Sequence, residues 1–402
     1  MKAGTVKIDI TPQPAAGVFM TGYTNIHNKP SMGTHDSLYA RILLFDDGQT
    51  RVALVALDLI GLNPGRLTEM VGGLGVEGLL LAASHTHGGP MVLDLYEPCG
   101  EDRSWPAGNP YLSWVEEQIA AGIAQVKETL QPVRLSVGSG VVDISFNRRL
   151  VKPDGSVEMI WGQNRERRQP YGPVDPEVGI VRVDDLEGKP VVLLCNYACH
   201  PVVLGSENRL LTADFPGYTC AYLENQFPGA LALFLQGGCG DLDPYVDVQN
   251  DFAPAQEQGE VLGREAKRVV RAMGPYREGA EHALESEPDL ELIELSRECR
   301  RYYDPAARCQ IEYSVLRIGR SLAFLNLPGE PFVELQLSLK KRSPLPHTFL
   351  LGYTNGYAGY FPTVQASREG GYGANSGLTI HVEAGVGEAM VEAALGVLRQ
   401  SR

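Results

Sequence analysis

Short apolar runs alternate in this chain with longer segments of helical period, and this alternation limits the folds open to it. Six apolar runs predict strands, at residues 51–62, 78–85, 190–198, 230–238, 321–329 and 347–354. Five segments predict helices, at residues 111–130, 214–227, 256–273, 330–342 and 385–400. Because strands that alternate with helices build a sheet covered by those helices, we predict an α/β fold with a mixed or mostly parallel sheet flanked by helices.

Two segments depart from this alternation. Residues 134–185 contain shorter strand-like stretches joined by turns, which indicates a β-rich insertion or a second sheet. Residues 280–312 look like a variable excursion that could shape the mouth of a pocket. Since no linker rich in Pro, Gly and Ser divides the chain, we expect residues 1–402 to form a single domain.

Charge and hydropathy restrict the partners and the compartment. The formal net charge of −14 argues against nucleic acid and anionic membranes, which would repel an acidic protein. The N-terminus, MKAGTVKIDITP, lacks the apolar core of a signal peptide, and no apolar run reaches the length of a membrane span. We therefore expect a cytoplasmic protein without stable membrane association, whose oligomeric state the sequence leaves open.

Seven cysteines, an odd number in a long chain, suit reduced thiols better than a disulfide framework. Cys195 and Cys199 have a spacing loosely like a zinc knuckle, but no second pair at that spacing exists. We expect these two side chains to be buried as small hydrophobic residues.

The stretch LLLAASHTHGGP places His85 and His87 just past the carboxyl end of a predicted buried strand. Open α/β sheets bind their ligands at that edge. Residues two apart project to one side of an extended backbone, so we expect both rings to face one cleft. A pair of purely structural histidines is the alternative.

Other predicted strands also deliver polar groups just past their carboxyl ends. His200 follows the strand at 190–198, Glu330 follows the strand at 321–329, and Tyr353, Tyr357 and Tyr360 follow the last strand. This pattern favours one shared cleft over scattered surface residues. A catalytic zinc site needs imidazoles, a carboxylate and one open position, and His85, His200 and Glu330 would meet that count.

Ten short motifs occur in the order seen in the catalytic domain of the neutral ceramidase family, from about residue 5 to about residue 375. They are KIDITP, GY at 22–23, SHTHGGP, FNRR, VDPEVGIVRVDD, NYACHP, ADFPGY, QGGCGDLDP, LPGE and YTNGYAGYFPT. The combination of SHTHGGP, the His-Pro after a strand, GD-x-x-P and PGE is specific. The chain thus resembles a short bacterial relative of the neutral/alkaline, non-lysosomal ceramidases.

The resemblance implies roles for individual residues. It makes His85, His200, Glu330 and Tyr360 the ligands of one catalytic zinc ion. It places His87 beside the metal, facing the substrate. Arg148 would hold the substrate, and Tyr372, where the alignment is loose, would line the pocket. We add Tyr357, from the same tyrosine cluster, as a candidate substrate-binding residue.

Two departures from the family pattern affect the predicted chemistry. Relatives have Gly-Asp-Val-Ser-Pro where this chain has Gly-Asp-Leu-Asp-Pro, so Asp243 replaces the serine once proposed as nucleophile. Asp243 could shuttle a proton, bind a second cation or cap the following turn. The sequence also ends at Arg402, before the family's C-terminal immunoglobulin-like domain, and we expect a substrate smaller or more polar than ceramide.

Together these observations predict a zinc-dependent hydrolase that cleaves the amide bond of a small N-acyl compound with activated water. Catalytic candidates are His87 or Asp243 as the proton shuttle, and Arg148 and Tyr360 as oxyanion stabilisers. A zinc-dependent esterase, lactonase or other metallohydrolase is the alternative, and a non-catalytic ligand-binding relative is a further one.

Two other carboxylates have structural interpretations beside functional ones. Asp58 interrupts a buried strand and could orient a metal-bound histidine or make a structural hydrogen bond. Asp214 precedes a predicted helix, and we expect it to be the N-cap.

Overall fold

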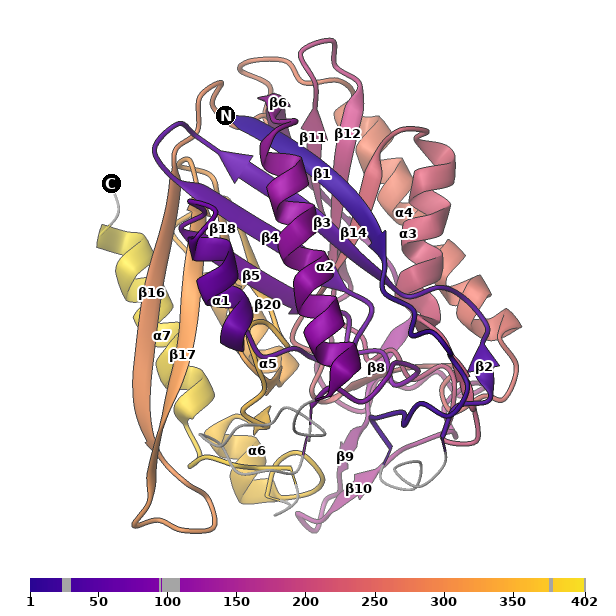
Figure 1. The fold of residues 1–402 in the computed structure, drawn as a ribbon. Helices are drawn as coiled ribbons and strands as arrows, with labels where there is room; N and C mark the ends of the chain where they lie inside the picture. The colour runs from indigo at the N-terminus through magenta and orange to yellow at the C-terminus, as the bar shows by residue number, and fades with distance from the viewer. Residues whose placement is uncertain (24–29, 94, 96–108, 376–378, 401–402) are drawn as a thin grey trace.

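Four layers of secondary structure make up the fold (Figure 1). The computed structural model describes residues 1–23, 30–93, 95, 109–375 and 379–400. Two helices, α1 (Gly65–Gly72) and α2 (Pro110–Lys127), cover the outer face of a five-stranded sheet. The inner face of that sheet packs on two four-stranded sheets lying side by side, and four more helices cover their far face.

The first sheet has the order β5-β4-β3-β1-β6. Its strands are β1 (Lys2–Asp9), β3 (Tyr39–Asp46), β4 (Arg51–Leu57), β5 (Gly78–Ala83) and β6 (Gln131–Pro132). Successive side chains of a strand point to opposite faces, so the continuous apolar run in β4 serves two cores. Ala53, Val55 and Leu57 pack under the helices, whereas Leu54 and Ala56 pack against the inner sheets.

The inner sheets have the orders β14-β12-β11-β7 and β16-β17-β18-β20. Their strands are β7 (Arg134–Val141), β11 (Glu177–Asp184), β12 (Pro190–Tyr197), β14 (Leu231–Gln236), β16 (Leu290–Arg300), β17 (Arg308–Ile318), β18 (Leu322–Asn326) and β20 (His347–Leu351). The two sheets meet where Asn196 Nδ2 donates to the carbonyls of Leu235 and Leu350 at 2.9 and 3.3 Å. The amide of Gly352 also donates to the carbonyl of Gln236 at 3.1 Å.

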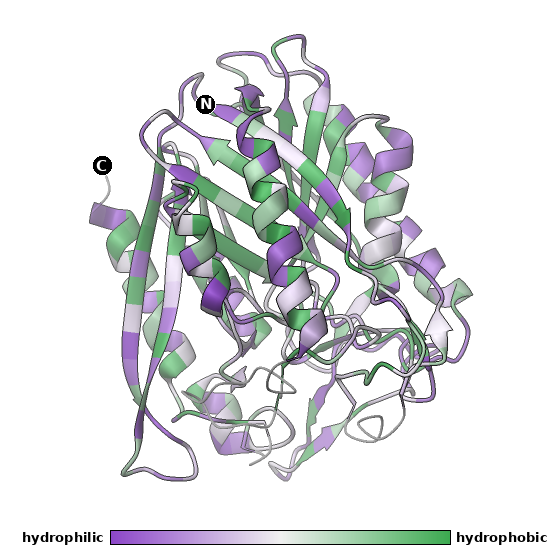
Figure 2. Ribbon diagram, viewed as in Figure 1, coloured by the Kyte–Doolittle hydropathy of each residue, from purple (hydrophilic) through white to green (hydrophobic). Residues whose placement is uncertain are grey.

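The remaining helices are α3 (Asp214–Gln226), α4 (Ala253–Met273), α5 (Val333–Arg342), α6 (Val364–Glu369) and α7 (Val386–Gln400). Apolar and polar residues alternate along the helices (Figure 2), as expected of helices that bury one face. In α4 the buried residues include Leu262, Ala266, Val269 and Val270, spaced by three or four positions. Burial of these stripes, rather than helix propensity, holds the helices to the sheets.

All six predicted strands and all five predicted helices are present. The mixed sheet is confirmed, but parallel pairs are the minority, because hairpins such as β3 to β4 and β16 to β17 join neighbouring strands directly. Of the two alternatives for the β-rich segment at 134–185, the second sheet is correct, since β7 and β11 form half of an inner sheet. The excursion at 280–312 contributes to the long hairpin of β16 and β17.

Short strands connect the loops at one end of the layers, which is the lower end in Figure 1. They are β2 (Gly33–Thr34), β8 (Ser145–Asn147), β9 (Arg149–Val151), β10 (Val157–Met159), β13 (Leu210–Leu211), β15 (Leu242–Pro244), β19 (Glu330–Pro331) and β21 (Tyr360–Phe361). They pair as β9 with β10, β8 with β15, β2 with β13 and β19 with β21. Residues from distant parts of the sequence are thereby tied to one another.

Cysteine usage and helix hydropathy agree with the sequence. Cys195 and Cys199 are fully buried, as predicted, and all six cysteines within the described part of the chain are free thiols. Cys99 lies outside the described residues. Of the helices in the described ranges, none combines the length and apolarity that crossing a bilayer requires.

Two roles were open for Asp58, and its contacts are those of the structural one. Its Oδ2 accepts from Arg41 Nη1 at 2.7 Å and from the backbone amide of Tyr39 at 2.9 Å. Both members of the Arg41–Asp58 pair are at most 5% exposed, and together they join β3 to the end of β4. A charge that is removed from water is stabilised by a nearby opposite charge, so loss of one partner leaves the other buried and uncompensated.

We predict that Asp58→Ala lowers the free energy of unfolding by about 3 kcal/mol, because Arg41 stays buried and keeps only the more distant Glu224, at 3.8 Å, as a counter-ion. Urea denaturation monitored by circular dichroism measures this change. The control is Glu158→Ala, which breaks the solvent-exposed ion pair with Lys152 and should leave the urea midpoint unchanged. Equal midpoints for the two variants would contradict the prediction.

Candidate active site

Three buried side chains meet at the end of the sheets where β5, β12 and β18 reach their carboxyl ends. His85 follows β5, His200 follows β12, and Glu330 lies four residues beyond β18. Each of the three is at most 2% exposed. They meet because β4 and β5, β12 and β14, and β18 and β20 are parallel neighbours whose carboxyl ends share one edge.

Glu330 lies between the two histidines. Its Oε2 is 3.1 Å from His200 Nε2, and its Oε1 is 3.6 Å from His85 Nε2. Tyr353 Oη donates to Oε2 at 3.2 Å, and Tyr357 Oη donates to Oε1. One carboxylate is therefore oriented by four side chains from three loops.

Backbone carbonyls hold the other ring nitrogen of each histidine. His85 Nδ1 lies 2.8 Å from the carbonyl of Ile60, and His200 Nδ1 lies 2.6 Å from the carbonyl of Cys239. A carbonyl accepts only, so these contacts place a proton on Nδ1 of both rings. In this tautomer Nε2 carries a lone pair and no proton, and this is the form of histidine that binds a metal ion.

His87 completes a group of three imidazoles. Its ring centroid is 5.1 Å from that of His85 and 5.8 Å from that of His200. One nitrogen from each of the three rings lies within 4.8 Å of the others. Both nitrogens of His87 are buried without a hydrogen-bond partner among the described residues. Buried polar atoms without a protein partner need another group to contact. A divalent cation fits this set of ligand atoms.

Burial controls the protonation of this cluster. Burial lowers the pKa of His85 to about 4, and burial together with the neighbouring imidazoles lowers the pKa of His87 well below its usual value. Burial alone would raise the pKa of Glu330, but His85 and His200 keep it below its usual range. Two neutral imidazoles and one carboxylate are thus available at neutral pH.

His200 differs from the other two histidines. Burial would lower its pKa, but Cys239 and Glu330 raise it to about 10. The neighbouring carboxylate thus favours the protonated form of His200. A metal ion bound here would replace that proton, as metal ligands must deprotonate.

The two histidines of the HTH motif face one cavity, as predicted, but not through an extended backbone. Strand β5 ends at Ala83, and His85 has a left-handed φ of 67°. Its amide donates to the carbonyl of Leu59 at 3.0 Å, which fixes this turn. Non-glycine residues in this region are strained and often occur at functional sites. The spacing of two residues was therefore not the reason that the rings converge.

Gly22 and Tyr23, the GY motif, pack on His87. A Cβ on Gly22 would lie 2.4 Å from Cγ of His87, and the φ of Gly22 is +110°. The ring of Tyr23 meets that of His87 edge to face, with centroids 4.7 Å apart. The motif is thus explained by the close approach of the backbone to an active-site ring.

Arg148 and Asp243 form a buried ion pair beside the histidines. Arg148 Nη1 donates to Asp243 Oδ1 at 3.0 Å. Arg148 Nη2 donates to the Gly240 carbonyl at 2.7 Å and to Tyr360 Oη at 3.2 Å. Burial would lower the pKa of Arg148, but Asp243 raises it, so the guanidinium remains charged.

Asp243 therefore has a partner that none of the three earlier interpretations included. It lies in β15, directly opposite Phe146 of β8, and is 1% exposed. Its neighbour Asp241 accepts at Oδ1 from the backbone amide of Val333 at the start of α5, at 2.8 Å.

Tyrosines line the small cavity in front of the histidines. The cavity has a volume of about 20 Å³, room for about one water molecule, and Tyr357, Tyr360 and Tyr372 are among its lining residues. The ring of Tyr372 is 5.6 Å from that of Tyr360, and the guanidinium of Arg148 lies 5.6 Å from the Tyr372 ring. All four tyrosines that the sequence indicates for this site lie beside Glu330 or Arg148: Tyr353, Tyr357, Tyr360 and Tyr372.

One sequence prediction near the site is corrected. Helix α3 begins at Asp214 itself, and Ala213 is the N-cap residue. Asp214 accepts from the amides of Phe215 and Leu204 at 2.6 and 3.0 Å, with a left-handed φ of 54°. The carboxylate of Asp214 ties the start of the helix to the loop after His200. The backbone of Asp214 therefore has a conformation that an ordinary N-cap residue does not need.

Residues that sequence reasoning missed are mostly backbone groups. The carbonyls of Ile60 and Cys239, which orient the two histidines, carry no side-chain signal. Tyr353 was noted only as a member of a cluster, yet its hydroxyl contacts Glu330 and lies 3.1 Å from Cys239 Sγ. The sequence signal for Tyr353 is a tyrosine at the end of a strand that is predicted to be buried.

Comparison with known proteins identifies the family of this chain. The family model for the N-terminal region of neutral/alkaline non-lysosomal ceramidases matches residues 1–286. Similar curated proteins include the neutral ceramidase of Pseudomonas aeruginosa, 25% identical over 62% of this chain and 38% of its own length. The neutral ceramidase of Drosophila melanogaster is 27% identical over 61% of this chain and 36% of its own length. The matched region thus spans less than half of these relatives.

Solved structures share the fold. The crystal structure of neutral ceramidase from Pseudomonas aeruginosa superposes with a TM-score of 0.76 and 19% identity, over 99% of this chain and 74% of that one. A structure described as ceramidase complexed with C2 gives a TM-score of 0.75 at 20% identity. The fold is that of a neutral ceramidase catalytic domain. This chain belongs to the neutral/alkaline non-lysosomal ceramidase family.

We predict that Gly22→Ala lowers the free energy of unfolding by about 2–4 kcal/mol, because the new methyl group collides with the ring of His87 and also sits at a positive φ. Chemical denaturation measures the loss. Gly17→Ala is the control, since Gly17 has a φ of +88° but open space around it. Its cost should be only about 1 kcal/mol, from backbone strain alone. Equal losses would show that His87 is not held by this contact.

Proposed function

We propose that this chain is a zinc-dependent hydrolase that cleaves the amide bond of a small N-acyl compound. The observation that supports it most is the convergence of His85, His87 and His200 on the buried carboxylate of Glu330. In this proposal His85, His200, Glu330 and Tyr360 hold the ion. A bound zinc ion supplies Lewis acidity, which polarises a carbonyl group and lowers the pKa of water to about 7.

The chain's own residues would bind the substrate and handle its protons. The leaving nitrogen of an amide must be protonated before it departs, and His87 has two free ring nitrogens for this step. We assign to Arg148 and Tyr360, which are hydrogen-bonded to each other, the stabilisation of the negative charge that would develop on the carbonyl oxygen. Burial excludes bulk water and strengthens these contacts.

Asp243 is assigned to positioning Arg148. A carboxylate that accepts from a buried guanidinium at 3.0 Å is engaged as a counter-ion, which disfavours a free proton shuttle or a second cation site. The same ion pair makes the site polar where relatives have a serine. This polarity supports a substrate more polar than ceramide.

The first test combines a metal assay with Glu330→Gln. The purified chain should contain one zinc ion per molecule and lose activity with 1,10-phenanthroline. Glu330→Gln should lose the zinc and at least about 100-fold in kcat/KM. Glu334→Gln, in the first turn of α5, is the matched control and should keep both. Full turnover by Glu330→Gln on its substrate would refute the proposed chemistry.

The substrates for this assay are N-acyl amines from short polar to long-chain members, each beside its matched ester. Preference for short polar amides supports the proposal, and a preference for esters at every length would place the chain among the esterases instead. Zinc contents of Tyr360→Phe and His87→Gln separate the two possible ligand sets. We expect Tyr360→Phe to bind zinc more weakly and His87→Gln to retain zinc but lose turnover.

Asp243→Asn removes a charge while keeping an oxygen acceptor for Arg148. We expect it to lower the free energy of unfolding by about 3 kcal/mol, since the guanidinium remains buried. It should raise KM and leave the zinc content unchanged. Asp143→Asn, which disrupts the surface pair with Arg168, is the control and should behave as the parent. If Asp243 were the proton shuttle, the variant would instead lose one limb of the pH profile of kcat/KM.

A further inference from the structure

The long hairpin of β16 and β17 carries a pair of cysteines that face each other. Cys299 lies directly opposite Cys309 in the register of the two antiparallel strands. Residues that are directly opposite project to the same face of a sheet and have Cα atoms about 4.5–5.5 Å apart. Disulfide-bonded residues have Cα atoms about 4.4–6.8 Å apart, so the strands already hold these two cysteines at the spacing of a disulfide.

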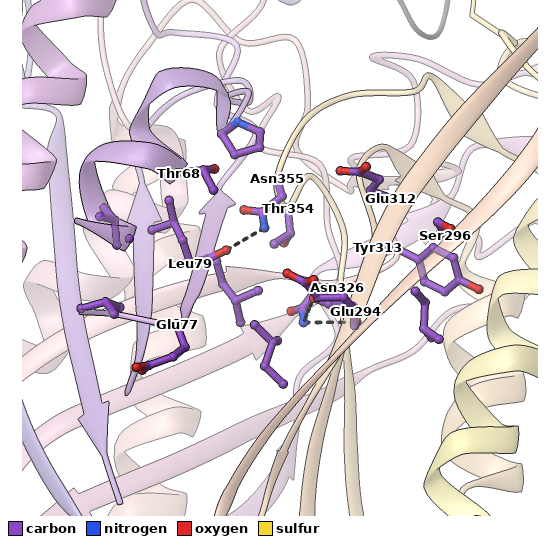
Figure 3. A pocket seen from close by; sticks show the side chains of 18 of the residues that line it. Thr68, Glu77, Leu79, Glu294, Ser296, Glu312, Tyr313, Asn326, Thr354 and Asn355 are labelled. Atoms are coloured by element: carbon purple, nitrogen blue, oxygen red, sulfur yellow. Dashed lines mark hydrogen bonds between the residues drawn. The ribbon is translucent and has the colours of Figure 1, made fainter. Parts of the chain in front are cut away.

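The two cysteine side chains lie on the buried face of the hairpin. Ser296 and Glu312, which are opposite each other further along the strands, line a cavity between the hairpin and β5 (Figure 3). Side chains alternate between the two faces of a strand, and Cys299 and Cys309 are an odd number of positions away, so they point to the other face. Cys299 is 1% exposed and Cys309 is 7% exposed, in the apolar core that includes residues of α7.

The ionisation of Cys299 shows that the two thiols are neighbours. Burial raises the pKa of Cys299 to about 11, and the thiol of Cys309 is the next largest cause of that rise. A thiol with a raised pKa is a weak nucleophile at neutral pH, whereas redox-catalytic thiols have lowered pKa values. The pair therefore suits a slow, lasting cross-link better than rapid redox catalysis.

The tip of the hairpin, residues 300–308, supports two loops of the active site. The amide of Tyr302 donates to the His381 carbonyl at 3.0 Å, and its hydroxyl donates to the Asn375 carbonyl at 3.2 Å. The same loops carry Tyr372 and Thr379, which line the cavity in front of the histidines. The position of the tip is thus linked to two walls of the site.

We propose that Cys299 and Cys309 are a disulfide site, at which a small oxidant such as hydrogen peroxide joins the two strands at the base of the tip. Both are free thiols in this structure, which is the reduced form. A bond at this point would limit local opening of the tip and of the loops that the tip holds. It would be reversible, because a thiol reductant reopens a disulfide by exchange.

The oxidation balances with one molecule of peroxide for each bond. The more exposed thiol, that of Cys309, attacks a peroxide oxygen, the O–O bond breaks, and a sulfenic acid and one water form. The thiol of Cys299 then attacks that sulfur atom, and the hydroxyl group leaves with the thiol proton as a second water. Two electrons pass from the two sulfur atoms to the peroxide. Cys299 Sγ gives up its weak contact with the Arg297 carbonyl, at 3.5 Å.

Peptide mapping of the full chain tests the proposal. The folded chain is treated with hydrogen peroxide at neutral pH, denatured with its free thiols alkylated, and digested with trypsin. Trypsin cuts after arginine, so Cys299 is released in residues 298–300 and Cys309 in residues 309–317. We expect mass spectrometry to find these two peptides joined, and to find them separate after dithiothreitol. The oxidised chain should also lose two of its seven titratable thiols.

Serine variants and amide exchange complete the test. Cys299→Ser and Cys309→Ser should each abolish the joined peptides. Cys220→Ser is the matched control and should keep them, although Cys220 is also a neighbour of another thiol, that of Cys195. Oxidation of the parent should slow amide hydrogen exchange at residues 379–383.

Three results would overturn the proposal. They are the absence of the joined peptides after oxidation, linkage of either cysteine to a different one, and equal amide exchange before and after oxidation. None of these results depends on whether the chain hydrolyses amides.

Discussion

The carboxylate of Glu330 is the interaction on which the site depends. It is fully buried, and its two oxygens are shared among two imidazoles and two phenols that arrive from β5, β12 and the loop after β20. A buried carboxylate without partners would cost several kcal/mol, so these elements must arrive together. The arrangement of the sheets at this end thus follows from the need to satisfy one charge.

The histidines are oriented by backbone rather than by other side chains. The carbonyls of Ile60 and Cys239 fix the tautomers of His85 and His200, and these two residues lie in the loops just after β4 and β14. The guanidinium of Arg148 is also held in place by fixed partners. These are its counter-ion Asp243 and the carbonyl of Gly240.

Much of the fold followed from local patterns. Strand β4 and helix α4 have periodicities that predict their type, because two-sided burial demands a continuous apolar run and one-sided burial demands a stripe. The pairing directions did not follow, since a short apolar run reads the same in a parallel pair and in a hairpin. For the same reason residues 134–185 predict either an insertion or a second sheet, and only the structure shows that β7 and β11 complete an inner sheet.

The sequence by itself determined the residue types at the strand ends, and hence that His85, His200 and Glu330 follow buried strands. It also determined family membership through motifs whose glycines, such as Gly22, are needed for close packing. Only the tertiary structure decided the left-handed turn at His85, the pairing of Asp243 with Arg148 and the role of Asp58 in holding Arg41. These depend on contacts between residues tens or hundreds of positions apart, which local pattern and propensity do not encode.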